Sequence, residues 1–189
     1  MPDTLAQWHT EHVNFAKLLN LLEEQLDLFH EGDSSNYELM LDIMFYMTHY
    51  PDVLHHPRED LAFAKIKERE KSAGPTVDEL SKQHAQLRKI GEELVRGLSD
   101  IVNGSISSRR RVEKPGRAYV ADFRSHMRTE EEEILPVAAK LLHDKDWLAI
   151  KKAIQHIDDP LFGKTAEKRY AAILRQITRQ AQAAKAATR

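Results

Sequence analysis

Histidine and glutamate recur in this chain at a spacing suited to metal binding. Six residues form the pattern: His12, His55, Glu59, His84, His126 and Glu130. Each glutamate follows a histidine by four residues, which on a helix places both side chains on one face, a turn apart. Imidazole and carboxylate groups together form a site for a divalent metal, with iron, manganese and zinc all eligible.

The order of these residues along the chain is the stronger signal. A lone histidine comes first, a His-x-x-x-Glu pair follows, and the same order then repeats. His12 precedes His55 by 43 residues and His84 precedes His126 by 42 residues, so the second half repeats the first at an offset of 71 or 72 residues. Two helical hairpins would then face each other across an approximate two-fold axis. Such a site suits two metal ions, each with two imidazoles, bridged by both glutamates.

Ordinary packing is the competing interpretation for each residue taken alone. A histidine on an apolar helix face is more often a hydrogen-bonded core residue than a ligand. In the acidic run of residues 130–133, we expect Glu131 and Glu132 to be solvated and Glu133 to share the face of Glu130. Asp52 and Tyr119 lie near predicted ligands on the same faces. Either could orient an imidazole, although packing is the more common role.

Alternating steps of three and four residues between apolar positions predict the helices that carry these histidines. The four apolar stripes cover residues 5–29, 41–66, 77–101 and 119–141. Polar turns separate them at residues 30–36, 71–76 and 103–116, with Thr76 as the expected N-cap of the third helix and Glu79 completing a capping box. Pro51 and Pro57 predict a kink or a helix restart beside His55. The chain is therefore expected to be all-α, an up-down-up-down four-helix bundle.

The last part of the chain has a different character. We expect residues 1–143 to form the bundle and residues 144–189 to form a C-terminal extension of shorter, more basic helices. These additional helices would pack on the bundle or on a partner. The apolar face around Tyr170, Ile173, Leu174 and Ile177 makes a homodimer through the C-terminal helices one possibility.

Composition restricts the classes of function. The 189 residues carry a formal charge of −2, which gives no whole-chain reason to expect nucleic acid or a membrane as partner. The chain has no cysteine, which excludes disulfides, thiolate zinc sites and iron–sulfur clusters. It also lacks a signal-peptide pattern and an apolar run long enough to span a bilayer. A cytoplasmic protein is the expectation.

The segments around the pattern resemble the hemerythrin-like, or HHE cation-binding, family. The matching segments are "TEHVNF", "HHPRED", "KQHAQL" and "SHMRTEEEEILP", within residues 5–142. The resemblance implies a non-haem di-iron four-helix bundle in which the six residues bind two iron ions, joined by an oxo or hydroxo bridge and by the glutamates. Open positions would accept dioxygen, nitric oxide or water. Family precedent also allows Glu131 in place of Glu130.

One departure from the family pattern affects function. Oxygen-carrying hemerythrins have a His-x-x-x-His pair on the third helix, whereas Leu80 and Arg88 flank His84 here at four residues on either side. The ligand set is therefore four histidines and two glutamates unless another histidine contributes. Three candidates remain: His56, His49 and His9. The smaller set argues against reversible oxygen carriage and suits oxygen reduction, peroxide or nitric oxide reactivity, or iron handling.

Three functions remain open at this stage. The pattern favours a di-metal binding protein that handles dioxygen, nitric oxide or iron, in sensing, storage or stress protection, over a dedicated enzyme. A di-metal oxidase or peroxidase is the second hypothesis, opposed by the lack of any Glu-x-x-His pair in the sequence. The third is a helical interaction module with a structural metal site. The ligand set accepts manganese or zinc as well as iron.

Overall fold

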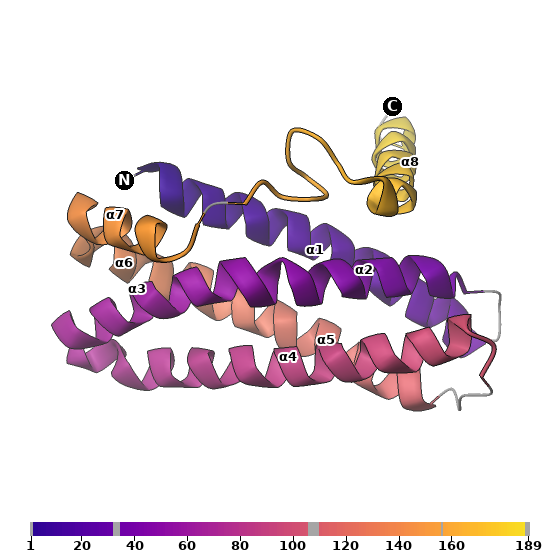
Figure 1. Cartoon of the computed structure of the whole chain (residues 1–189), viewed down its shortest axis with the longest axis horizontal. Helices are drawn as coiled ribbons and strands as arrows, with labels where there is room; N and C mark the ends of the chain where they lie inside the picture. Colours follow the sequence, from indigo (N-terminus) through magenta and orange to yellow (C-terminus); the bar gives the residue numbers. More distant parts are fainter. Residues whose placement is uncertain (1, 32–34, 106–109, 156, 188–189) are drawn as a thin grey trace.

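Four helical rods make up most of the chain. The computed structural model describes residues 2–31, 35–105, 110–155 and 157–187, and within them there is no strand. The first three helices are α1 (Pro2–Glu31), α2 (Tyr37–His49) and α3 (His56–Arg69). The next three are α4 (Gly74–Val102), α5 (Arg110–Thr129) and α6 (Leu135–Leu141). Figure 1 shows α2 and α3 as one bent rod beside α4, and the expected all-α bundle is confirmed.

Two π-helical turns interrupt the second and fourth rods. Pro51–His55 joins α2 to α3, and Glu130–Ile134 joins α5 to α6. In each turn a backbone N–H reaches back five residues, from His56 to Pro51 and from Leu135 to Glu130. Such turns hold one residue more than an α-helical turn and commonly occur at functional sites. The first of them is the interruption that the prolines beside His55 predicted.

The apolar stripes bury two clusters of side chains. The larger cluster lies between α1, α2, α4 and α5 and includes Phe15 and Phe123. The smaller one gathers Trp8 and Phe63 with residues of α6 and of α7 (Asp144–Ala153). Rings of both clusters contact buried histidines, because Phe15 and Trp8 both meet the ring of His55. The histidines therefore lie between the two clusters, surrounded by apolar side chains.

The helices after residue 143 pack on the same chain. In α7, Asp146 accepts two hydrogen bonds of 2.8 Å from Arg69 of α3. After a 3₁₀ turn at Lys168–Tyr170, α8 (Ala171–Ala187) lies across α2 (Figure 1). Tyr170 and Ile173 are buried there against the bundle. That apolar face is thus used within the chain, while the boundary between residues 143 and 144 and a homodimer stay predictions.

Two helix starts differ from expectation. Helix α4 begins at Gly74 with Pro75 in its first turn, and Thr76 lies inside the helix, so the predicted N-cap was wrong. Proline suits a first turn because it lacks the N–H that would have no partner there. Helix α5 begins at Arg110, inside the predicted break of residues 103–116. Residues 32–34 and 106–109 of the two predicted turns lie outside the described residues.

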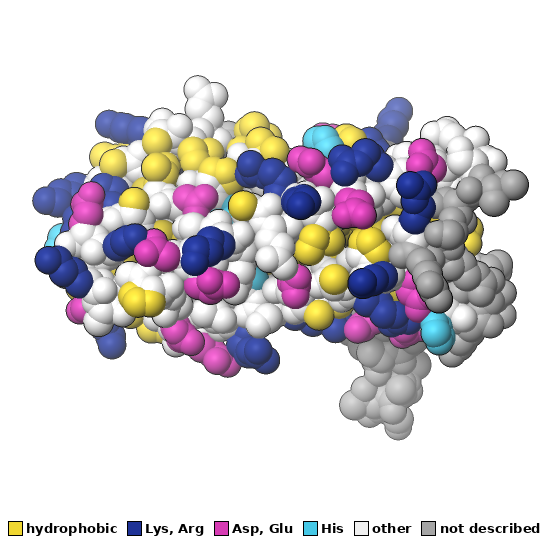
Figure 2. Space-filling model, turned by 90° about the horizontal axis from the view of Figure 1, so that it is seen from below, with side chains coloured by type: hydrophobic (Ala, Val, Ile, Leu, Met, Phe, Trp, Pro, Cys, Tyr) yellow, Lys and Arg dark blue, Asp and Glu magenta, His cyan; other side chains and the backbone are white. Residues whose placement is uncertain are grey.

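The surface and the helix lengths bear on possible partners. Figure 2 shows Lys and Arg side chains interspersed with Asp and Glu over the face that it presents. A mixed surface of this kind lacks the single-sign stripe that steers nucleic acid. Among the described helices, none has the length and hydropathy that a bilayer crossing requires.

Candidate metal centre

The first half of the site joins α1 to the second rod. His12 of α1 and His55 of the first π turn place their Nε2 atoms 3.0 Å apart. Oε1 of Glu59, one turn further along α3, lies 3.0 Å from Nε2 of His55 and 3.5 Å from Nε2 of His12. All three side chains are buried. Two imidazoles and one carboxylate oxygen thus converge on one point.

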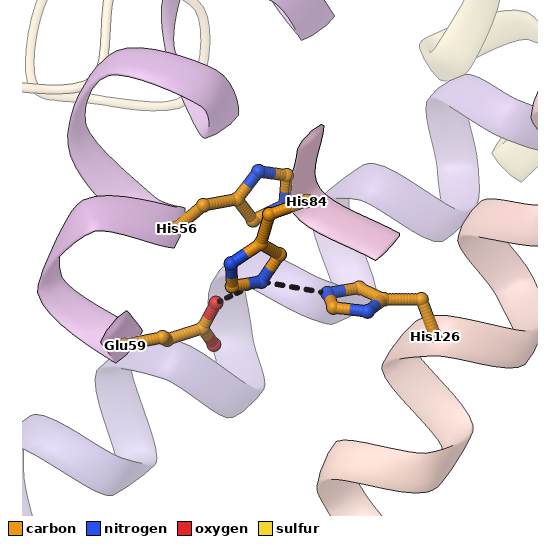
Figure 3. Close-up of side chains that lie close together, drawn as sticks. All are labelled: His56, Glu59, His84 and His126. Atoms are coloured by element: carbon orange, nitrogen blue, oxygen red, sulfur yellow. Dashed lines mark hydrogen bonds and ion pairs between the residues drawn. The ribbon is translucent and has the colours of Figure 1, made fainter. Parts of the chain in front are cut away.

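The second half repeats this arrangement between α4 and α5. His84 and His126 place their Nε2 atoms 3.1 Å apart. Oε1 of Glu130 lies 3.2 Å from Nε2 of His126 and 3.6 Å from Nε2 of His84. Figure 3 shows these two rings converging with Glu59, which projects from α3. The hairpin pairing inferred from the repeat is the pairing that the structure places together.

The two glutamates lie between the halves. Oε2 of Glu59 faces His84 at 3.7 Å, and Oε2 of Glu130 faces His12 at 3.4 Å. Each carboxylate therefore presents one oxygen to its own half and the other oxygen to the opposite half. All four oxygens are buried without a hydrogen-bond partner. Buried carboxylate oxygens are normally satisfied, so this arrangement fits a cation between them.

Protonation compensates these carboxylates in the metal-free chain. Burial alone would lower the pKa of His12, but the carboxylates of Glu131 and Glu59 outweigh it and raise the pKa to about 10. Asp60 and Glu130 likewise overcome burial at His84 and raise its pKa to about 10. Protons on these rings therefore occupy the role that a metal ion would take over. Metal binding must displace them.

Burial acts on the pKa of Glu59 and Glu130 in the opposite sense and would raise both values. Burial and the charge of Glu59 would raise the pKa of Glu130, but His126 and His84 outweigh both and hold it at about 2. The pKa of Glu59 lies well below its usual range, because His55 and His12 overcome the effect of burial. Both carboxylates are thus charged at neutral pH and available as metal ligands.

A fifth histidine faces the second half. The ring of His56 stacks on His84 with centroids 4.2 Å apart and planes 13° apart. Potential ligand atoms of His56, Glu59, His84 and His126 all lie within 4.8 Å of one another (Figure 3). Burial and the neighbouring imidazoles keep the pKa of His56 well below its usual value, so its ring stays neutral. A neutral imidazole has the free lone pair that a metal ion needs.

The other two candidate histidines do not reach this cluster. His49 is exposed, stacks on Phe45 and bonds through Nδ1 to the carbonyl oxygen of that residue. His9 is exposed and lies 3.1 Å from Oε1 of Glu131. Of the three candidates left open by the sequence, only His56 is placed to contribute a ligand.

Each of the four histidines in the predicted pattern has a hydrogen-bond partner at Nδ1, on the side away from Glu59 and Glu130. Glu131 bonds to His12 at 2.7 Å, and Glu11 bonds to His55 at 2.5 Å. In the second half, Asp60 bonds to His84 at 2.9 Å, and the neutral amide of Gln83 bonds to His126 at 3.1 Å. Such partners fix which ring nitrogen faces the metal.

Several of these partners differ from what the sequence suggested. Glu131 was expected to be solvated, but the second π turn directs it to His12, where it acts as a partner of a candidate ligand. Glu133 was expected on the inner face, but the same turn leaves it exposed. Asp52 lies 3.1 Å from Nδ1 of His56, as a group that could orient this ring. Tyr119 is buried, and its hydroxyl has no hydrogen-bond partner.

Glu11, Asp60 and Gln83 were missed at the level of sequence. Each directly adjoins a residue of the pattern, namely His12, Glu59 and His84. That adjacency is a weak signal, because each of the three bonds to a histidine on a different helix rather than to its neighbour. Only the packing of the rods identifies those partners.

A helical bundle whose centre holds buried imidazoles around two buried carboxylates that lack hydrogen-bond partners is the architecture of a metal-binding protein. The model of the Hemerythrin HHE cation binding domain matches residues 3–138. The chain therefore belongs to the hemerythrin HHE cation-binding family. Among curated proteins, none matches the chain.

Proposed function

We propose that the chain binds two iron ions and handles dioxygen, nitric oxide or iron itself. His12 and His55 would hold one ion, and His56, His84 and His126 would hold the other. Glu59 and Glu130 would bridge the two ions. The observation that carries this proposal is the set of four buried carboxylate oxygens without hydrogen-bond partners, between two groups of converging imidazoles.

The donor set suits this metal. Imidazole nitrogen and carboxylate oxygen are good ligands for iron, and they accept manganese and zinc as well. Membership of the hemerythrin family supports iron. Iron held here would supply coordination positions to which a diatomic ligand can bind.

The surroundings of the site favour a small uncharged ligand. Rings of Phe15, Trp8 and Phe63 contact the buried imidazoles, so apolar side chains form part of the surroundings of the metal positions. Such a lining excludes water and disfavours charged ligands, which would lose their hydration on entering. The buried histidines and glutamates would hold a metal ion away from solvent. We therefore infer sensing, storage or stress protection in the cytoplasm rather than turnover of an organic substrate.

Metal analysis tests the proposal directly. Protein produced with ample iron should contain about two iron atoms per chain, one for each ligand group. The variant His84→Ala should lose metal, whereas His49→Ala, a matched change at an exposed histidine of α2, should keep it. Well under one metal atom per chain in the wild-type protein would contradict the proposal.

A spectroscopic measurement then separates the candidate ligands. The visible spectrum of the iron-loaded protein should change on exposure to dioxygen or to nitric oxide, and the gas that changes it identifies the ligand. Steady consumption of dioxygen or peroxide that depends on Glu59 would instead favour the oxidase or peroxidase alternative. Unchanged spectra with both gases would leave iron storage as the role.

A further inference from the structure

Glu11 is a buried carboxylate with an unusually complete set of partners. Its side chain is 6% exposed, and Oε2 lies 2.5 Å from Nδ1 of His55. Oε1 accepts a hydrogen bond of 3.1 Å from the Tyr50 hydroxyl and one of 2.8 Å from the amide of Gln7. The guanidinium of Arg58 donates to Oε2 at 3.3 Å. The carboxylate is thus held from α1, from α3 and from Tyr50 between α2 and the π turn.

The other Nδ1 partners differ from Glu11 in charge or in burial. The side chain of Glu131, which bonds to His12, is 31% exposed, and that of Asp60, which bonds to His84, is 47% exposed. Gln83, which bonds to His126, carries no charge. Water and salt screen exposed charges much more than buried ones. Of these four partners in the described chain, Glu11 is therefore the carboxylate that solvent screens least, and Arg58 is its partly buried counter-ion.

The bond to Glu11 also decides how His55 can bind a metal. A carboxylate accepts but does not donate, so the Nδ1 that faces Glu11 must carry the ring proton. In the neutral ring Nε2 then keeps its lone pair, and this atom points toward Glu59 and His12. A negative charge behind an imidazole also makes its free nitrogen a stronger ligand, and loss of such a partner typically costs about 10- to 100-fold in metal affinity.

We propose that Glu11 is a positioning residue, which holds His55 in the tautomer that binds metal. It selectively strengthens the binding of the ion held by His12 and His55. The proposal rests on the proposed function, because it requires that the site binds metal. The two halves of the site have matching inner geometry. They should nevertheless differ in metal affinity, because one buried carboxylate outside the ligand set acts on only one of them.

The network around Glu11 gives this role a structural basis. Tyr50 stacks on Tyr46 with ring centroids 5.5 Å apart, and the Tyr46 hydroxyl donates to Asp159 at 2.8 Å. Arg58 also donates through Nε to the carbonyl oxygen of Leu54, inside the first π turn. The residues that hold Glu11 are themselves held by their neighbours. A carboxylate fixed in this way can set the orientation of His55 before any metal arrives.

The test compares Glu11→Gln with Asp60→Asn in the full chain. Each change removes one charge behind one histidine and keeps the shape of the side chain. Cobalt(II) serves as the probe, with stepwise binding followed by its visible absorption in competition with a chelator. We expect Glu11→Gln to lower the affinity for one of the two cobalt ions by about 10- to 100-fold and to leave the affinity for the other unchanged. Asp60→Asn should change either affinity by only about threefold, because Asp60 is exposed.

A second readout reports the tautomer itself. The nitrogen NMR shifts of His55 in the metal-free protein, at a pH where the ring is neutral, should show Nδ1 protonated and Nε2 unprotonated in the wild type. In Glu11→Gln a share of the rings should carry the proton on Nε2 instead. Tyr50→Phe removes one donor to Glu11 while keeping the ring, and it should weaken the same ion by a smaller factor. This variant keeps the test valid if Glu11→Gln does not fold.

Three results would overturn the proposal. Wild-type affinity for both ions in Glu11→Gln would show that Glu11 has no influence on metal binding. Equal weakening of both ions would indicate a general structural role instead. An unchanged His55 tautomer with weakened binding would contradict the positioning role. Each of these results leaves the proposed function intact, whereas a wild-type protein that binds no cobalt, zinc or iron would contradict the proposed function itself.

Discussion

The two halves of the site match in their inner geometry and differ in what surrounds them. The paired Nε2 atoms lie 3.0 Å apart in the first half and 3.1 Å apart in the second. Behind the first pair lie two carboxylates, Glu131 and Glu11. Behind the second pair lie an exposed carboxylate and an amide, while His56 adds a third imidazole on the inner side.

The π turns account for much of this difference. They do not occupy equivalent places in the two halves, since the first includes His55 whereas the second begins at Glu130. At the first turn, two consecutive histidines are both buried, and His56 faces the opposite half. At the second turn, Glu131 bonds to His12 across the bundle. The first turn therefore gives the second half an imidazole that the first half lacks, and the second turn gives His12 its carboxylate partner.

The largest expected effect comes from breaking what the halves share. Glu59 faces His12 and His55 with one oxygen and His84 with the other. Glu59→Gln should therefore lower the affinity for both ions. We expect the loss per ion to be at least about 100-fold, above that of an outer partner. A free metal concentration of about 100 times the Kd of one position stabilises the native protein by about 2.7 kcal/mol, or about 5–10 °C in Tm. The variant should lose this stabilisation.

Thermal unfolding with and without a chelator measures this loss. Glu132→Gln is the matched control, because Glu132 is exposed in the same acidic run. If Glu59→Gln retained two ions at the affinity of the wild type, the two halves would not share this carboxylate.

The next effect should be confined to one half. In His56→Ala the second half loses one of three imidazoles, so the affinity for its ion should fall by about 100-fold. The affinity for the ion at His12 and His55 should not change. Metal content after dialysis against a weak chelator should fall from about two ions to about one. The exposed His49→Ala variant controls for loss of a histidine. If His56→Ala retained both ions, His56 would not be a ligand and each half would have two imidazole ligands.

Changes of pH should affect metal binding in both halves. The raised pKa values of His12 and His84, each about 10, stabilise the metal-free protein fully below pH 6.5, and this contribution disappears as the pH rises toward 10. The pKa of His55 is raised too, because the carboxylates of Glu59 and Glu11 outweigh its burial. Metal binding displaces these protons, so affinity should increase with pH over the same window.

Each half contains one histidine whose pKa is raised to about 10, His12 in the first half and His84 in the second. The affinity for each ion should therefore increase by about 10-fold per pH unit for each proton displaced. Zinc titrations between pH 6.5 and 9 in competition with a chelator would measure both slopes. An affinity that does not change with pH would contradict this prediction.

The smallest expected effect comes from making the halves more alike. Gln83→Glu would place a carboxylate behind His126, as Glu11 lies behind His55. Gln83 is only half-buried, so we expect the second ion to bind about 3- to 10-fold more tightly. Gln86→Glu, whose side chain bonds to Asp122 on the surface, is the control. If Gln83→Glu did not raise the affinity for the second ion, the charge of the partner of His126 would not control metal affinity.

Much of this molecule could be predicted from its sequence, because the signals are local. Apolar steps of three and four residues predicted the rods of the bundle, and the two prolines predicted the interruption beside His55. The repeat placed His12 with His55, and His84 with His126, in the pairs that the structure brings together. Their role as metal ligands stays a prediction. The start of α4 was wrong by three residues, because Gly74 and Pro75 also accept a first helical turn.

The remaining features depend on contacts between rods. The sequence by itself determined which residues share a helix face, because that follows from the number of residues per turn. Only the tertiary structure decided that His56 joins the second half, that Glu131 bonds to His12, and that Glu11 lies behind His55. These contacts join residues far apart in the chain, and they depend on the π turns and on how neighbouring rods pack. A local pattern of spacing contains no information about either.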